Sequence, residues 1–196
     1  MSRVSQAEAK ANRERVVVAA SRLFRENGVA KVGIADVMQS IGLTQGGFYK
    51  QFASKAALVE EATVKAFADN LQDLVALDEA TGEHKAAWKS LLESYFSIEH
   101  RDDPGSGCPA AGFAGDIARL PEHKETYAKG VQELAEWIAP GEAGLAAYAA
   151  LVGGILLARA TEGTPLSEQI LHAARTAATD AVEGCHPNAG KVAAEK

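Results

Sequence analysis

A window of twelve residues combines side chains that can bind an anionic backbone. The window supplies a hydroxyl from Thr44, an amide from Gln45, a phenol from Tyr49 and ammonium groups from Lys50 and Lys55. Phosphate oxygens accept hydrogen bonds from all of these donors. Lys55 lies in the first turn after Ser54, a good N-cap, where the helix dipole disfavours a cation unless an anion docks there. Taken singly, each residue is typical of a solvated surface, but together they favour contact with nucleic-acid phosphates.

Two consecutive glycines, Gly46 and Gly47, lie in the middle of this window. They cost a short helix roughly 2 kcal/mol relative to alanines. A helix whose first turn approaches a phosphate gains from having no side chain there, because the backbone amides come close. We interpret the glycines as evidence of such an approach. Packing against the preceding helix is the alternative.

Cys108 is the second candidate for chemistry. It precedes Pro109, and proline prefers the first helical position, so the thiol is predicted to be the N-cap of a short helix. The helix dipole would favour its thiolate. A small buried hydrophobe is the alternative. A cysteine enzyme would need a base, and the only nearby histidine in sequence is His100. No catalytic motif spacing supports one, so no enzyme is predicted.

Metal and cofactor sites are not predicted. The five histidines form no zinc pattern, and Cys185–His186 has no partners at metal-ligand spacing. Two cysteines far apart exclude a secreted disulfide framework and favour a reducing cytoplasm. The N-terminus has no signal-peptide pattern, and the uncharged stretch from Ala143 to Ala158 is shorter than a membrane helix needs, so no membrane partner is expected.

The charge of the chain is divided between its two parts. Residues 1–57 hold nine Lys or Arg against four acids, a net charge of +5. The remainder, residues 58–196, holds 11 basic and 22 acidic residues, a net charge of −11. Added to the +5 of residues 1–57, it gives the net charge of −6 of the whole chain. Either the clustering is chance on a solvated face, or a basic head meets an anion.

The elements that position these residues are predicted to be helices throughout, because apolar residues recur at three and four positions and strand patterns are almost absent. The head would contain three helices and the body the rest. Their expected bounds are Glu8–Asn27, Ile34–Ile41, Thr44–Gln51, Ser54 to about Leu77, Trp88–Ile98, a short helix from Pro109, Pro121–Ile138, Glu142–Thr161 and Leu166–Glu183. Gly42 marks the turn of a helix-turn-helix.

The stretch from Arg13 to Leu58 resembles the DNA-binding head of the TetR family of bacterial transcriptional regulators, above all in GLTQGGFYKQFASKAAL. The resemblance implies that Thr44 caps the recognition helix and that Tyr49 and Lys55 contact phosphates. It implies that Gln45, Gly46, Phe48 and Lys50 face the major groove. The sequence departs from the family pattern at Val32–Gly33, where Thr-Ser is usual, and at Ala35, where an arginine often reaches DNA.

For the rest of the chain the resemblance implies an all-α homodimer that binds a palindromic operator in double-stranded DNA. It implies a head (1–53) and a ligand-binding and dimerisation body (54–184) with the helix from Ser54 as connector and lever. The tail (185–196), CHPNAGKVAAEK, is expected from its own sequence to be frayed. Dimerisation would use 142–161 and 166–183. The first of these segments is small or apolar nearly all round, so either a partner subunit or the chain's own core covers it.

The effector site is predicted around Cys108. Trp88, Tyr95 and Phe113 either fill the core of the body or line a pocket beside the thiol. The segment GCPAAGFAGDIAR resembles TetR-like regulators with a Gly-Cys pair beside the pocket, some of which sense electrophiles through that cysteine. The leading hypothesis is a repressor released by a small molecule or an electrophile. A cysteine-dependent enzyme and a constitutive DNA-binding protein without effector are the alternatives.

Overall fold

The computed structural model describes residues 6–184, and every regular element in that range is a helix. The elements are α1 (Gln6–Asn27), α2 (Ile34–Ser40), the 3-10 helix η1 (Gln45–Lys50), α3 (Lys55–Thr81), α4 (His84–Tyr95), α5 (Ile98–Asp102), α6 (Pro109–Ile117), the 3-10 helix η2 (Pro121–His123), α7 (Lys124–Ile138), α8 (Glu142–Ala160) and α9 (Pro165–Glu183). The predicted all-α fold is confirmed. The expected frayed tail, with Cys185 and His186, lies outside the described residues.

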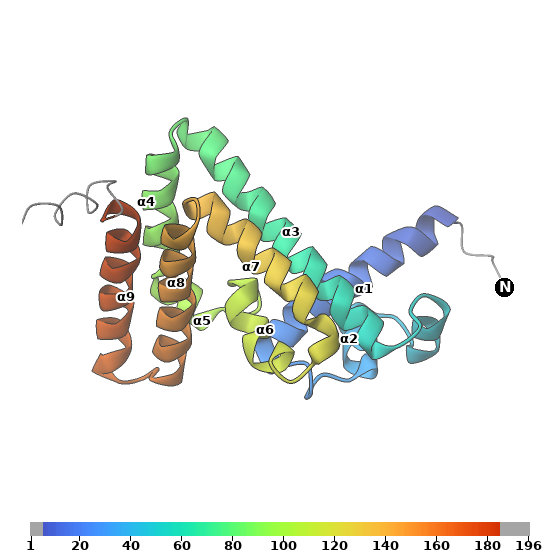
Figure 1. The fold of residues 1–196 in the computed structure, drawn as a ribbon. Helices are drawn as coiled ribbons and strands as arrows, with labels where there is room; N and C mark the ends of the chain where they lie inside the picture. Colours follow the sequence, from blue (N-terminus) through green and yellow to red (C-terminus); the bar gives the residue numbers. More distant parts are fainter. Residues whose placement is uncertain (1–5, 185–196) are drawn as a thin grey trace, which may run out of the picture.

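The long helix α3 connects the two ends of the molecule (Figure 1). The helices α1, α2 and η1 gather around its first half, and α4 turns back at its far end. Helix α7 runs beside α3, while α8 and α9 form an antiparallel hairpin at the end opposite the head. The arrangement separates the candidate anion-binding window from the hairpin by most of the length of the molecule.

The head has its own hydrophobic cluster, which forms because α1 presents Val16, Ala20 and Phe24 on one face at helical spacing. Phe48 and Phe52 stack on each other within it, with ring centroids 5.1 Å apart. The cluster does not end at residue 53. It takes in Leu58 and its neighbours from α3, and Phe113 and Ile117 from α6.

A second hydrophobic cluster fills the body between α3, α4, α7, α8 and α9. Helix α8 buries Ala147, Leu151 and Ile155 in it and packs tightly against α9. At Gly154 a Cβ would lie 2.4 Å from that of Ala174, so the close approach requires glycine. By length and composition alone α8 could cross a membrane, but its buried face is part of this core.

Two expected elements differ from the structure. The segment 44–51 forms a 3-10 helix over Gln45–Lys50, and the Thr44 side chain makes no capping hydrogen bond. The adjacent Gly46 and Gly47 lower the α-helical propensity of this segment, in line with the free-energy cost of glycine in a helix. The segment expected as one helix from Trp88 to Ile98 is divided at Phe96 and Ser97, because the Ser97 hydroxyl accepts the amide of His100 and starts α5. Ser54 caps α3 as predicted.

Two glycines within α6 give a matched test of helix packing. A Cβ at Gly112 would lie 2.5 Å from Cγ of Arg25 on α1, whereas the nearest atom to one at Gly115 is 4.0 Å away. We expect Gly115→Ala to raise the free energy of unfolding by up to about 1 kcal/mol through helix propensity. Gly112→Ala should lower it by about 1–3 kcal/mol, because the Arg25 stem must move. Urea unfolding measures both, and equal effects would contradict the packing.

Candidate nucleic-acid interface and body cavity

The turn between α2 and η1 is held by backbone geometry and by α1. Gly42 has φ +73, a left-handed conformation that favours glycine. The amide of Leu43 donates to the carbonyl of Met38 at 2.8 Å. Arg15 of α1 donates through Nη2 to the carbonyl of Ile41 at 2.8 Å. These contacts fix the direction in which η1 leaves the turn, so the outward face of η1 is preorganised.

Five of the seven residues expected to contact DNA lie exposed on this face: Thr44, Gln45, Gly46, Tyr49 and Lys50. Tyr49 is 64% exposed, unusually open for an aromatic ring. Phe48 is the correction: it is fully buried and belongs to the core of the head. The Phe48 ring anchors η1 to the core of the head and is not part of the surface. The Phe52 ring stacks against it, and the Tyr49 ring meets it edge-on.

The structure offers no packing reason for the two glycines of η1. A Cβ at Gly46 would meet nothing within 4 Å, and one at Gly47 would touch only the Met38 methyl at 3.6 Å, an ordinary contact. The alternative of packing against α2 therefore loses its support within the described chain. The exposed backbone of Gly46 leaves room for a close approach from outside.

Lys55 has an intramolecular partner that the sequence did not reveal. Its Nζ donates to the carbonyl of Val29 at 2.6 Å and lies 6.0 Å from the centre of the Phe24 ring. This contact explains a lysine in the first turn of α3 and joins α3 to the loop after α1. An ammonium group carries three N–H donors, so two remain for a phosphate.

A cavity of about 210 Å³ lies in the body, and Cys108 is one of the residues that line it. Tyr95 also lines it, as predicted. Trp88 and Phe113 do not: Trp88 is buried in the body cluster, and Phe113 packs in the core of the head. The cavity walls come from five helices, α3, α4, α5, α7 and α8, and from the segment before α6. The lining residues are Asn70, Leu74, Leu91, Ser94, Tyr95, His100, Ser106, Gly107, Cys108, Leu134, Ile138, Tyr148 and Leu151.

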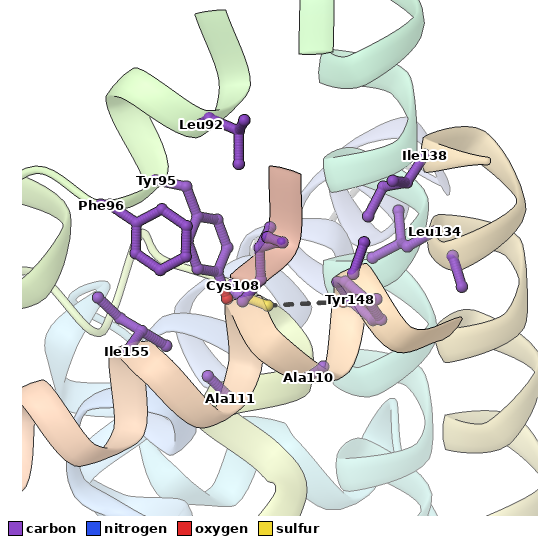
Figure 2. Packing of buried hydrophobic residues seen from close by; sticks show 14 of the residues in the cluster. Leu92, Tyr95, Phe96, Cys108, Ala110, Ala111, Leu134, Ile138, Tyr148 and Ile155 are labelled. Carbon is purple, nitrogen blue, oxygen red and sulfur yellow. Dashed lines mark hydrogen bonds between the residues drawn. The ribbon is translucent and has the colours of Figure 1, made fainter. Parts of the chain in front are cut away.

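Cys108 is the N-cap of α6 as predicted, but the residue is only 4% exposed and its side chain makes no capping hydrogen bond. Its Sγ lies 3.5 Å from the Tyr148 hydroxyl (Figure 2). His100 does not bond to the sulfur, because its Nε2 accepts the backbone amide of Cys108 at 3.1 Å and its Nδ1 lies 2.6 Å from the carbonyl of Tyr95. The histidine is therefore committed to the backbone and is not placed as a base for the thiol.

The electrostatics of the cavity follow from burial. Burial raises the pKa of Tyr95 and of Tyr148 well above the usual value, so both phenols stay protonated. Burial lowers the pKa of His100, which keeps its ring neutral. Tyr148 was not predicted here. Its only sequence signal is that it is the one polar aromatic residue in an Ala- and Gly-rich helix.

Helix α6 connects the cavity to the head. Arg25 of α1 donates through Nη1 to the carbonyl of Gly107 at 2.5 Å, next to Cys108. At the other end of α6, Asp116 accepts the amide of Val29 at 2.8 Å. Tyr127 of α7 donates to the carbonyl of Ala110 at 2.8 Å. Both ends of this short helix are thus bonded to the segment that leads into the helix-turn-helix.

Comparison with known proteins identifies the head. Residues 16–62 match the family described as "Bacterial regulatory proteins, tetR family". Among curated proteins the chain is similar to the HTH-type transcriptional regulator TtgR and to the probable HTH-type transcriptional regulator ArpR, both of Pseudomonas putida. Each is 38% identical over 60 residues, which are 31% of this chain. The match spans 29% of the length of these relatives.

Solved structures are similar over nearly the whole chain. Reduced NemR of E. coli has a TM-score of 0.67 at 17% identity, covering 85% of this chain and 96% of its own. A TetR-family regulator from Cytophaga hutchinsonii gives 0.69 at 18%, covering 92% and 97%. One from Chloroflexus aurantiacus gives 0.63 at 23%, covering 89% and 96%. Residues 16–62 thus match the TetR family of bacterial regulators in sequence, and the chain as a whole shares the fold of these solved structures.

Proposed function

We propose that this protein is a cytoplasmic transcriptional repressor that binds a palindromic operator in duplex DNA as a homodimer and is released by an effector bound in the body. The single observation that carries the proposal is the outward face of η1. It presents exposed polar and cationic side chains on a turn held rigid by α1, within a part of the chain that carries a net charge of +5. Family relatives named as transcriptional regulators support it.

The proposed contacts follow the exposure of the side chains. Gln45 and Lys50 read base edges, while Thr44, Tyr49 and the remaining donors of Lys55 bind phosphates, and Gly46 lets the backbone approach. The body carries the net charge of −11, which holds it away from the duplex. We retain residues 1–53 as the DNA-binding unit, although its core takes side chains from α3 and α6.

The dimer is proposed to form through α8 and α9. On the outer face of α8, Leu145, Ala149, Gly153 and Leu156 follow one another at helical spacing and are exposed or partly exposed. Leu145 is 50% exposed. Leu157 of α8 and Leu166 of α9 add further exposed leucines to the hairpin. Exposed apolar faces of this kind mark protein interfaces, and a second copy of α8 and α9 would complete a four-helix bundle.

Release is proposed to act through α6 as well as through the α3 lever. The cavity wall at Gly107 and Cys108 is also the hydrogen-bonding partner of Arg25 in the head. A ligand that shifts this wall therefore shifts the end of α1. A coupling of ~1–3 kcal/mol would change operator affinity ~5- to 150-fold. A constitutive DNA-binding protein is the second candidate, but it gives no role to a cavity in direct contact with the head.

A salt titration with duplex selected by the protein from a random library tests the DNA contacts. Lys50→Ala should weaken binding and reduce the slope of log affinity against log salt by about 0.9 per subunit, because each subunit of the dimer loses one cationic contact with the DNA. Tyr49→Phe should weaken binding without changing that slope. Lys129→Ala, which removes an exposed body lysine, is the charge-matched control and should leave both quantities unchanged. If Lys50→Ala and Tyr49→Phe both bind the duplex with wild-type affinity, the assignment of these two residues as DNA contacts is wrong.

The dimer interface is tested at Gly153. A Cβ there meets nothing within 4 Å of the same chain, so Gly153→Glu should leave the fold of the subunit intact. It should place a carboxylate in the proposed bundle and shift the protein to a monomer in sedimentation equilibrium, with loss of operator binding. Gln72→Glu adds the same charge to exposed α3 and should remain dimeric. A dimeric Gly153→Glu protein would place the interface elsewhere.

The electrophile branch of the proposal is tested with iodoacetamide. Alkylation of Cys108 would add a group inside the body cluster and should lower operator affinity by tenfold or more; one tenfold step corresponds to about 1.4 kcal/mol. Cys108→Ser should keep operator binding after treatment, while Cys185→Ser should still lose it. Peptide mass spectrometry verifies the modified residue. Equal loss of binding in all three proteins would exclude Cys108 as the sensor.

A further inference from the structure

We propose that His100 is an acid-sensitive latch: a second proton on its ring breaks the hydrogen bond to the Cys108 amide and loosens the cavity wall that contacts the head, which weakens operator binding. The inference rests on the DNA-binding function proposed above and adds a form of regulation to it. His100 lies in α5, and its ring contacts the segment that starts α6.

Two backbone groups fix the protonation state of the His100 ring. Nδ1 lies 2.6 Å from the carbonyl oxygen of Tyr95, which can only accept, so this nitrogen carries the proton and donates. Nε2 accepts the amide of Cys108 at 3.1 Å, so it is unprotonated. A ring with a proton on both nitrogens would direct an N–H at the N–H of Cys108. The doubly protonated ring is therefore incompatible with the hydrogen bonds that hold this wall.

The surroundings of the ring oppose a positive charge. Burial lowers the pKa of His100 from its ordinary value of 6.5. The Tyr95 carbonyl and the Asp103 carboxylate act the other way, whereas the Arg159 guanidinium on α8 lowers the pKa further. The titratable or charged residues around the ring are Tyr95 of α4, Arg101 and Asp102 of α5 itself, Asp103 and Cys108 of the segment before α6, and Arg159 of α8. Because Arg101 and Asp102 pair with each other, they supply no free counter-charge.

The wall is packed too closely to accept a charged ring without opening. A Cβ at Gly107 would lie 2.9 Å from Nε2 of His100 and 2.8 Å from Nη2 of Arg159, so both groups pack directly against this turn. Arg159 is itself held in place, because it donates to the carbonyls of His100 and Arg101 at 2.9 Å each. Closely packed groups leave few alternative positions, so a second proton is accommodated by opening the turn at Gly107 and Cys108.

Opening of this turn reaches the head through α1 and α6. The carbonyl of Gly107 accepts a hydrogen bond from Nη1 of Arg25 on α1 at 2.5 Å, and Cys108 is the N-cap of α6. At the other end of α6, Asp116 accepts the amide of Val29, in the segment that leads into the helix-turn-helix, at 2.8 Å. Protonation of His100 therefore loosens the contact between α1 and α6, and the placement of the head on the body becomes less defined.

Acid, rather than alkali, favours the open wall. The pKa of His100 is lowered only while the wall is closed, so above about pH 6.5 the ring is neutral in both states and the latch contributes its full stability. Below that pH the open state takes up a proton that the closed state does not. Each further pH unit then favours the open wall by up to about tenfold, until the ring in the closed wall is itself protonated.

NMR and hydrogen exchange on the full chain without DNA test the latch. The ring nitrogen shifts of His100 should show Nδ1 protonated and Nε2 unprotonated at about pH 7.5. The protection of the Cys108 amide, corrected for the intrinsic pH dependence of exchange, should fall roughly 3- to 10-fold between about pH 6.5 and 5.5. His100→Gln cannot take up a proton in this range, so its protection should not depend on pH. His172→Gln, which removes an exposed histidine of α9, is the matched control and should behave like the wild type.

Operator affinity is then measured for the same three proteins between about pH 7.5 and 5.5. The ratio of wild-type to His100→Gln affinity should fall about fivefold or more as the pH is lowered, while the ratio of wild-type to His172→Gln affinity should stay constant. These ratios cancel the effect of pH on the other groups that contact DNA.

Three results overturn the inference: an Nε2 that is protonated at about pH 7.5, a wild-type Cys108 amide whose corrected protection does not change with pH, or a constant ratio of wild-type to His100→Gln affinity. The first two are measured on the wild type, so they decide even if His100→Gln does not fold. A protein that binds no operator at any pH contradicts the proposed function, and the exchange of the Cys108 amide then still decides whether the latch exists.

Discussion

One short helix, α6, is shared by the two hydrophobic clusters, and the relation between head and body depends on it. Its first turn, with Ala110 and Ala111, packs in the body, whereas Phe113 and Ile117 reach the core of the head. A side chain in a closely packed core has few positions available, so a displacement at one end of α6 cannot be absorbed locally. Gly112 lets α6 approach α1 closely enough for the Arg25 stem to pack against it. The cavity and the head are therefore mechanically adjacent, although they lie far apart in sequence.

The surface of the head results from what is buried beneath it. Phe48 and Phe52 stack in the core and hold η1 against α1, and this burial turns Gln45, Tyr49 and Lys50 outward. The ion pair of Arg13 with Glu61, together with the packing of the Arg13 guanidinium 4.6 Å from the centre of the Phe52 ring, ties the same core to α3. The outward face of η1 is thus supported by rigid helices rather than by a loop, and such support favours a defined contact geometry.

The cavity in the body shows how a hydrophobic core can hold a specific polar arrangement. His100 is saturated by two backbone groups and Tyr148 by the Cys108 thiol, so most of the buried polar atoms of the walls are paired. The Tyr95 hydroxyl is buried beside the same thiol, and burial together with that thiol raises the pKa of Tyr95 well above its usual value. The same burial makes Cys108 less accessible than its place at a helix N-terminus suggests.

Local features of the sequence determined the all-α fold, most helix bounds, the Ser54 cap, the Cys108 N-cap and the family of the head. Periodicity, caps and breakers act within a few residues, so they can be read from one chain. Only the tertiary structure decided that Phe48 is buried, that Lys55 contacts the carbonyl of Val29, that Trp88 and Phe113 lie outside the cavity, and that His100 serves the backbone. Each of these depends on which distant elements pack together. Residue spacing along a helix predicts that a side chain faces inward, but whether it meets a core, a cavity or a carbonyl is set by its neighbours in space.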